Sequence, residues 1–272
     1  MENFKEKIII ALDYADLMPV KELLEKLKGR AYFYKIGFEL FTSCGAESVN
    51  LVKNYGCKVF LDLKYHDIPN TVYKAVKSAG KLGADIINVH ASGGLDMMKA
   101  AKTAGEEASY AAGRHIDVIA VTVLTSLSDA DVKQVFYGFE ELDNFSGGGI
   151  LSLRAQRSNL GYAHKNEDGG GIASNLALHL AKLAGTAGLD GVVCSGLESL
   201  AIKNVLGRDF KTVTPGIRLK AKNADGGQKR IMTPSEAFKA GADYIVVGRE
   251  ITEAENPADA LADIHADAER QI

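Results

Sequence analysis

Charged side chains gather at one place in the sequence, where an apolar run ends in an acid, an amine and a second acid. Asp62 and Lys64 are two residues apart in a predicted strand, so their side chains are expected on one face. Asp67 follows three residues later, and Lys35 lies near the end of an earlier apolar run. An ammonium group held between carboxylates can donate a proton where negative charge develops. The pattern therefore predicts a proton-donating active site.

A structural ion-pair network is the alternative interpretation of these four residues. Burying such an array is costly, and apolar side chains of similar volume are often as stabilising or more so. Stability alone therefore explains the array poorly. A site that needs a fixed electric field for catalysis explains it better.

The elements that must position these residues are short apolar runs that alternate with helical patterns. Eight runs are rich in β-branched residues, as in parallel strands covered by helices: Ile8–Asp13, Tyr32–Gly37, Lys58–Lys64, Ile86–His90, Val118–Leu124, Gly191–Ser195, Thr212–Gly216 and Tyr244–Arg249. This alternation predicts a (β/α)8 TIM barrel in a single domain over residues 1–272. An open doubly wound sheet is the alternative.

Helical patterns and glycines mark the intervals between the runs. Helical spacing occurs at Leu17–Leu27, Pro69–Leu82, Ser128–Phe136, Leu176–Ala187 and Pro257–Arg270. Glycine precedes several strands, at Gly83, Gly188 and Gly241, as at helix C-termini. Residues 141–171 contain glycine runs and few apolar residues, and they predict an inserted surface segment within the fifth βα unit.

Composition limits the classes of function. The chain has 272 residues, with 32 Lys and Arg against 35 Asp and Glu, so its net charge of −3 argues against nucleic acid as a partner. Its three cysteines form no Cys-x-x-Cys pair, which is typical of a reducing cytoplasm. The sequence contains no run of 18 apolar residues, so it predicts no membrane span. We expect a cytoplasmic protein that handles a small molecule.

Seven segments in order resemble one enzyme family. The first is the stretch from Asp62 to Thr71, which reads DLKYHDIPNT. The others are Ile10–Asp13, Lys35–Gly37, Ala120–Ser126, Thr214–Arg218, Gln228–Pro234 and Val246–Arg249. Together they closely resemble the signature of the orotidine 5′-phosphate decarboxylases, in particular the bacterial branch. The resemblance covers the whole chain except the inserted segment.

This resemblance implies a reaction and a set of roles. The substrate would be orotidine 5′-monophosphate and the products UMP and carbon dioxide, with no metal or organic cofactor. Asp62 would lie against the substrate carboxylate, Lys64 would protonate C6, and Asp67 would come from the second subunit of a homodimer with shared active sites. The implied binding residues are Lys35 and Asp13 at the ribose, Ile68 and Thr71 from the second subunit, Thr125 at the pyrimidine, Pro215 and Arg218 facing the ligand, and Gln228, Gly248 and Arg249 at the phosphate.

The phosphate assignment also has a physical basis. Barrels commonly bind phosphate with the loops after strands seven and eight, and arginine offers a planar fork to phosphate oxygens. The loop Ile217–Thr233 is long for its place, which predicts a lid. Two departures from the family pattern fall here: Glu250 replaces the usual proline, and Gly226–Gly227 replace acidic residues. We expect them to weaken phosphate binding at most.

Two rival functions remain open. One is a magnesium-dependent sugar-phosphate decarboxylase or synthase of the same barrel group, which shares the Asp-x-Lys-x-x-Asp segment but needs an acid on the second strand. Lys35 lies there and would repel a metal ion. The other is a non-catalytic phosphate-binding barrel, against which the complete charge array argues.

Overall fold

The structure, a computed structural model, describes residues 4–137, 171–219 and 231–270. Within them, eight parallel strands pair in chain order and close into a barrel. They are β1 (Ile8–Leu12), β2 (Phe33–Ile36), β3 (Lys58–Tyr65), β4 (Ile86–His90), β5 (Asp117–Val121), β6 (Gly191–Val193), β7 (Lys211–Thr214) and β8 (Tyr244–Val247). The predicted (β/α)8 barrel is confirmed, and the alternative of an open sheet is wrong.

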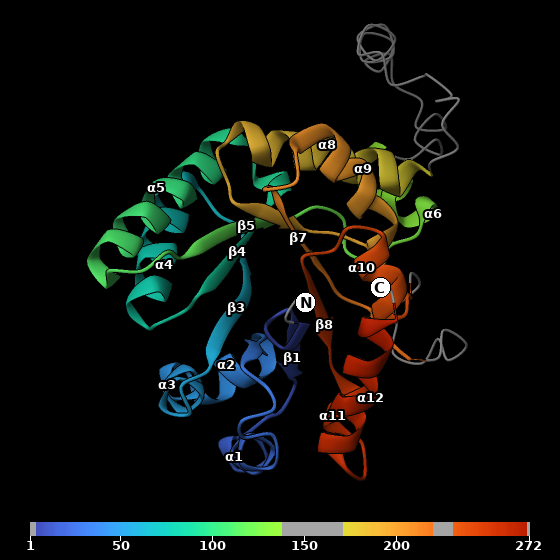
Figure 1. The fold of residues 1–272 in the computed structure, drawn as a ribbon. Coiled ribbons are helices and arrows are strands. Elements are labelled where there is room, and N and C mark those ends of the chain that lie inside the picture. The colour runs from blue at the N-terminus through green and yellow to red at the C-terminus, as the bar shows by residue number, and fades with distance from the viewer. Residues whose placement is uncertain (1–3, 138–170, 220–230, 271–272) are drawn as a thin grey trace, which may run out of the picture.

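Helices follow the strands and surround the barrel (Figure 1). They are α1 (Leu17–Lys26), α2 (Phe38–Cys44), α3 (Ala46–Asn54), α4 (Pro69–Lys81), α5 (Leu95–Ala112), α6 (Asp129–Val132), α8 (Ile172–Thr186), α9 (Gly196–Leu206), α10 (Pro234–Lys239), α11 (Arg249–Thr252) and α12 (Pro257–Glu269). Short 3-10 turns precede β1 and α5, at η1 (Phe4–Glu6) and η2 (Ala91–Gly93), and a π-helical turn, η3 (Lys133–Tyr137), follows α6.

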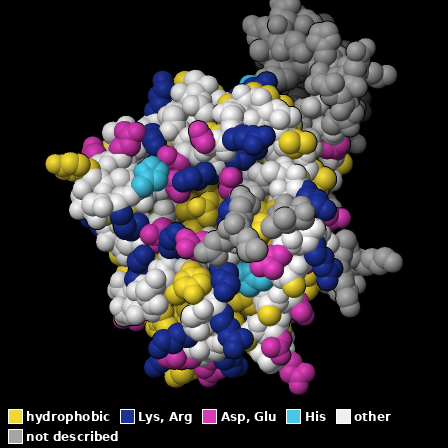
Figure 2. Space-filling model, in the orientation of Figure 1, with side chains coloured by type: hydrophobic (Ala, Val, Ile, Leu, Met, Phe, Trp, Pro, Cys, Tyr) yellow, Lys and Arg dark blue, Asp and Glu magenta, His cyan; other side chains and the backbone are white. Residues whose placement is uncertain are grey.

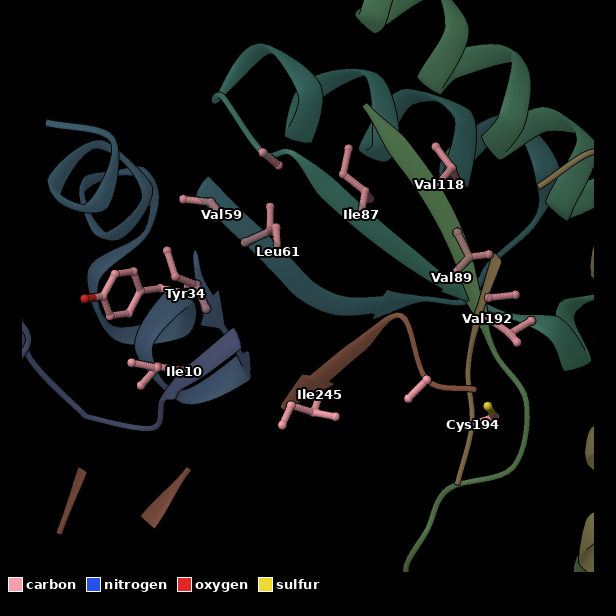
Figure 3. Close-up of a cluster of buried hydrophobic side chains, with 14 of the residues drawn as sticks. Ile10, Tyr34, Val59, Leu61, Ile87, Val89, Val118, Val192, Cys194 and Ile245 are labelled. Atoms are coloured by element: carbon pink, nitrogen blue, oxygen red, sulfur yellow. The ribbon is translucent and has the colours of Figure 1, made fainter. Parts of the chain in front are cut away.

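Side chains alternate along the strands between the inside of the barrel and the helices. A small cluster fills the inside: Ile9, Ala11, Phe33, Phe60, Ile86, Ile119, Val213 and Val246. The larger core lies between strands and helices. Figure 3 shows Leu61, Ile87 and Val118, on the neighbouring strands β3, β4 and β5, pointing toward the helices. On β4, Ile86 therefore faces inward and Ile87 outward, which places Asn88 on the inner face above Ile86.

Glycines end the helices as the sequence predicts. Gly83, Gly188 and Gly241 have positive φ angles of 102°, 79° and 92°, which an L side chain adopts only with strain. Each lies three residues before the first residue of the strand that follows. Turns of this kind bring the chain from each helix back to the start of the next strand.

A repeated contact ties the N-terminal ends of the strands to the helices. Asp85, in front of β4, accepts hydrogen bonds from the backbone N–H of Val59 (2.7 Å) and from Lys53 Nζ (3.0 Å). The same arrangement recurs at Asp190 with Val118 and Lys102, and at Asp243 with Thr212 and Lys203. These contacts lie at the end of the barrel opposite the C-terminal ends of the strands, the end usually devoted to stability.

Two sequence predictions differ from the structure in this part of the chain. The fifth strand ends at Val121 rather than Leu124, so Thr122–Thr125 belong to the loop above the barrel. The helix predicted over Ser128–Phe136 is the short α6 followed by the π-helical turn. The inserted segment predicted at 141–171 lies outside the described residues, except for Gly171.

The surface is of mixed charge on the face drawn in Figure 2, where Lys and Arg side chains are interspersed with Asp and Glu. No patch of one sign gathers on that face. In the part of the chain that the structure describes, no helix combines the length and the apolar character needed to cross a bilayer.

Candidate active site

A cavity of about 1070 Å³ opens at the C-terminal end of the barrel. Its floor is apolar and includes Ala11, Phe60 and Val246 of the inner cluster. Its wall contains most of the residues that the sequence singled out: Asp13, Lys35, Asp62, Lys64, Thr125, Pro215, Arg218, Gly248 and Arg249. The volume is slightly above the usual range of about 300–1,000 Å³ for small-molecule sites and is sufficient for a nucleotide.

Four charged residues form one row of alternating sign across the mouth: Asp13, Lys35, Asp62 and Lys64. We call this row the charge array; within one chain it contains Asp13 and not the predicted Asp67. Lys35 Nζ lies 3.3 Å from Asp13 Oδ1 and 3.4 Å from Asp62 Oδ2. Lys64 Nζ lies 2.7 Å from Asp62 Oδ1. Asp62 therefore lies between two ammonium groups, as its spacing from Lys64 and the position of Lys35 on the neighbouring strand predict.

Asp62 is the buried centre of this array, with 8% of its surface exposed. Burial alone raises the pKa of its carboxyl group. The ammonium groups of Lys35 and Lys64 and the hydrogen bonds from Lys64 and Asn88 outweigh burial, so the pKa lies below its usual value. The carboxylate is thus held in its charged form at neutral pH.

The two lysines of the array are held differently. A Cβ atom at Gly37 would lie 3.0 Å from Lys35 Nζ, so glycine at this position leaves space for the ammonium group. Lys64 Nζ lies 5.4 Å from the centre of the Phe38 ring, within range of a cation–π contact. The backbone of Lys64 has a φ of 42°, a left-handed conformation that costs roughly 1–2 kcal/mol for a residue with a side chain.

The expected phosphate end of the cavity combines Gly248 and Arg249 with Arg218 from the loop after β7. Glu250 also lines the cavity, and its Oε1 accepts a hydrogen bond of 3.2 Å from the backbone N–H of Leu219. The carboxylate of Glu250 therefore joins α11 to the loop after β7. Gln228, which the sequence also assigns to the phosphate, lies outside the described residues.

Three predicted residues are not in the cavity of a single chain. Asp67, Ile68 and Thr71 are exposed, and Ile68 has 67% of its surface accessible. Asp67 Oδ1 accepts a hydrogen bond of 2.6 Å from the backbone N–H of Ile68. Because they follow Lys64 in the chain, they lie on the surface beside the mouth, where a second subunit could bring its own copies to the site.

Asn88 is a polar residue of the site that the sequence analysis missed. It is fully buried on the inner face of β4, and its Nδ2 donates a hydrogen bond of 2.6 Å to Asp62 Oδ1. The only signal in the sequence is an amide within the otherwise apolar run Ile86–Val89.

His90, two residues after Asn88, lies against His66 with a ring-centre distance of 5.6 Å. Burial and the neighbouring His66 lower the pKa of His90.

One group of possible metal ligands occurs in the described residues, and it is not at the mouth. His115, Asp117 and Asp190 lie together at the N-terminal end of the barrel. Lys211 and Lys102 already form ion pairs with the two carboxylates. At the mouth, Lys35 occupies the second strand, where the magnesium-dependent rival needs an acid.

Fold and site together define a class: a (β/α)8 barrel with an acid–amine array beside an arginine-bearing pocket at the C-terminal ends of its strands. The orotidine 5′-phosphate decarboxylase / HUMPS family model matches residues 6–264. The chain belongs to this family.

Named relatives align along nearly the whole chain. The orotidine 5′-phosphate decarboxylase of Idiomarina loihiensis is 44% identical over 258 residues, which cover 95% of this chain and 96% of the relative. That of Vibrio cholerae is 42% identical over 260 residues, covering 96% and 97%. The crystal structure of orotidine 5′-phosphate decarboxylase from Lactobacillus acidophilus has a TM-score of 0.72 at 35% identity and covers 97% of this chain and 99% of that one.

Proposed function

We propose that this chain decarboxylates orotidine 5′-monophosphate to UMP and carbon dioxide, the last step of pyrimidine synthesis, in the cytoplasm. Its family and the names of its relatives point to this activity. The observation that carries the proposal for this chain is the ammonium of Lys64, 2.7 Å from Asp62 at the wall of a nucleotide-sized cavity.

The chemistry requires a stabilised electron pair. The bond between C6 and the carboxylate carbon breaks, carbon dioxide leaves without the bonding electrons, and the pair remains on C6. Lys64 donates a proton to this pair, which completes UMP, and its neutral amine regains a proton from water. In this proposal Asp62 lies against the substrate carboxylate, so the repulsion between the two carboxylates is relieved when carbon dioxide departs.

The array can supply only part of the required acceleration. Two unit charges about 4 Å apart interact by about 4 kcal/mol at an effective dielectric constant of about 20. Enzymes lower barriers by roughly 8–23 kcal/mol. The remainder has to come from binding the remote phosphate and ribose, which holds the reacting carbon against the array. In this proposal, Arg249, Arg218, Gly248 and Gln228 bind the phosphate, Lys35 and Asp13 the ribose, and Thr125 and Pro215 the pyrimidine end.

We further propose that the active unit is a homodimer in which Asp67, Ile68 and Thr71 of each subunit complete the other's site. Exposed apolar side chains beside the mouth, Phe38 and Ile68, support such a contact. A mixture of inactive Lys64→Ala and Asp67→Ala subunits tests it. Mixed dimers would contain one intact site and regain activity, whereas sites confined to single subunits would leave the mixture inert.

The test of the activity itself is spectroscopic. Purified protein should consume orotidine 5′-monophosphate, seen as the loss of the substrate's absorbance, and Lys64→Ala should not. A wild-type protein as inert as the variant would leave a phosphate-binding barrel without catalysis as the better interpretation. Activity that disappears with EDTA would instead favour the magnesium-dependent sugar-phosphate enzymes.

A further inference from the structure

Strand β3 carries an irregularity at the residues that form the charge array. Leu61 pairs with Ile87 of β4, but the next pair along the two strands is Tyr65 with Val89. Three residues of β3, from Asp62 to Lys64, therefore lie opposite a single residue of β4, which is Asn88. Bulges of this kind re-aim side chains and interrupt the hydrogen bonding between strands.

Asn88 satisfies the backbone at this interruption. Its Oδ1 accepts a hydrogen bond of 2.8 Å from the backbone N–H of Lys64, in the place of a carbonyl group of the neighbouring strand. Lys64 is also the one non-glycine residue with positive φ in the part of the chain that the structure describes. The amide of Asn88 thus holds Lys64 in a backbone conformation that an isolated strand would not adopt.

The same side chain also reaches the acid of the array. Asn88 Nδ2 donates to Asp62 Oδ1 at 2.6 Å, and Lys64 Nζ contacts the same oxygen at 2.7 Å. One buried amide therefore links the backbone of the proposed proton donor to the carboxylate that holds its ammonium group. An asparagine suits both contacts because its amide offers an acceptor and a donor side by side.

We propose that Asn88 is a positioning residue of this reaction, which sets the backbone of Lys64 and the carboxylate of Asp62 in the geometry that proton transfer to C6 requires. The inference rests on the proposed function. Asn88 is fully buried beneath the array and does not line the cavity, so it acts through these two residues and touches no substrate.

Two substitutions separate this role from simple stability. Asn88→Leu keeps a similar volume and removes both hydrogen bonds. Asn88→Asp keeps the shape and the acceptor, but it removes the donor to Asp62 and adds a repelling charge. A displacement of about 1 Å at a reacting group can cost about 100-fold in rate. We expect kcat to fall by about 100-fold in Asn88→Leu, with the affinity for UMP changed by less than about threefold.

Val89→Ala is the matched control, because Val89 is fully buried on the same strand and points outward in Figure 3. Val89→Ala should lower the melting temperature and leave kcat near that of the wild type.

The pH dependence of kcat gives a second test, because a loss of packing alone would not change it. Without the donor of Asn88, the acidic limb of the kcat profile should shift to higher pH, because Asp62 is protonated more easily.

The inference fails if folded Asn88→Leu and Asn88→Asp both keep the kcat and pH profile of the wild type. It also fails if a crystal structure of Asn88→Leu retains the Lys64–Asp62 contact and the left-handed Lys64. Should Asn88→Leu not fold, Asn88→Asp decides. An inert wild-type protein would count against the proposed function, whereas the crystal structure still tests the positioning itself.

Discussion

Replacing Asp62 by asparagine removes the carboxylate between two ammonium groups. Its oxygens lie 2.7 Å from Lys64 Nζ and 3.4 Å from Lys35 Nζ, where each attraction is worth about 5–6 kcal/mol at an effective dielectric constant of about 20. Desolvation of the carboxylate opposes much of this sum. Breaking a buried ion pair by removing one partner costs about 3–5 kcal/mol, and we expect Asp62→Asn to lower the free energy of unfolding by that amount at pH 7.

The effect should depend on pH in a defined direction. Because the pKa of Asp62 is lowered in the folded protein, its stabilising contribution is complete above the unfolded carboxyl pKa of about 3.9. That contribution is lost as the pH falls through the folded pKa. The difference in unfolding free energy between wild type and Asp62→Asn should therefore stay constant from pH 7 to about pH 5 and shrink as the pH falls below about 4.

Urea denaturation followed by circular dichroism at several pH values measures both effects. Glu6→Gln is the control, because Glu6 pairs with Lys58 at 3.2 Å while both side chains are about half exposed. An exposed pair of this kind contributes at most about 1 kcal/mol. If Asp62→Asn were as stable as the wild type at pH 7, or if the difference between them were the same at pH 7 and at about pH 2, the reasoning about the buried array would be refuted.

Three further predictions concern the substrate and the metal. Arg249→Ala should lower kcat/KM for orotidine 5′-monophosphate by about 10–150-fold, because a hydrogen bond from arginine to phosphate is worth about 1.5–3 kcal/mol. Steady-state kinetics measure this, and an unchanged kcat/KM would show that Arg249 does not bind the phosphate. Glu250→Gln should tighten UMP binding at low salt by less than about fivefold, since a partly exposed charge contributes about 0–1 kcal/mol. If calorimetry found weaker binding instead, the hydrogen bond between Glu250 and Leu219 would matter more than the charge of Glu250. Saturating EDTA should leave kcat unchanged, and a loss of activity restored by magnesium would favour the metal-dependent rival.

The barrel could be predicted from the sequence because each strand is a short β-branched run between glycine-marked turns. The ends of the strands then place Lys35, Asp62 and Lys64 at one mouth, and these residues do meet in the structure. The backbone conformation that brings these side chains together could not be predicted. Simple alternation of side chains treats residues 62–64 as a regular strand, whereas they form a bulge with a left-handed Lys64.

Asn88 could not be recognised from the sequence for a related reason. Its role depends on lying opposite the bulge of another strand, 24 residues away, and nothing in the local pattern reveals that register.

The role of Asp67 could not be derived from the pattern of one chain for another reason. An exposed carboxylate beside the mouth gains a catalytic role only from a second subunit, and one chain's sequence pattern does not define how two chains pack.

The most direct measurement asks whether an ammonium group at position 64 is what the reaction needs. Lys64→Cys should be inactive while still binding UMP, and treatment with 2-bromoethylamine should rebuild an amine of nearly the same length on the new thiol. We expect activity to rise by at least about 100-fold on treatment, since a placed general acid contributes about 100- to 10,000-fold. The wild-type protein treated in the same way controls for reaction at Cys44, the cysteine that is not buried. An untreated variant with wild-type activity, or a treated variant that binds UMP and stays inert, would contradict the account.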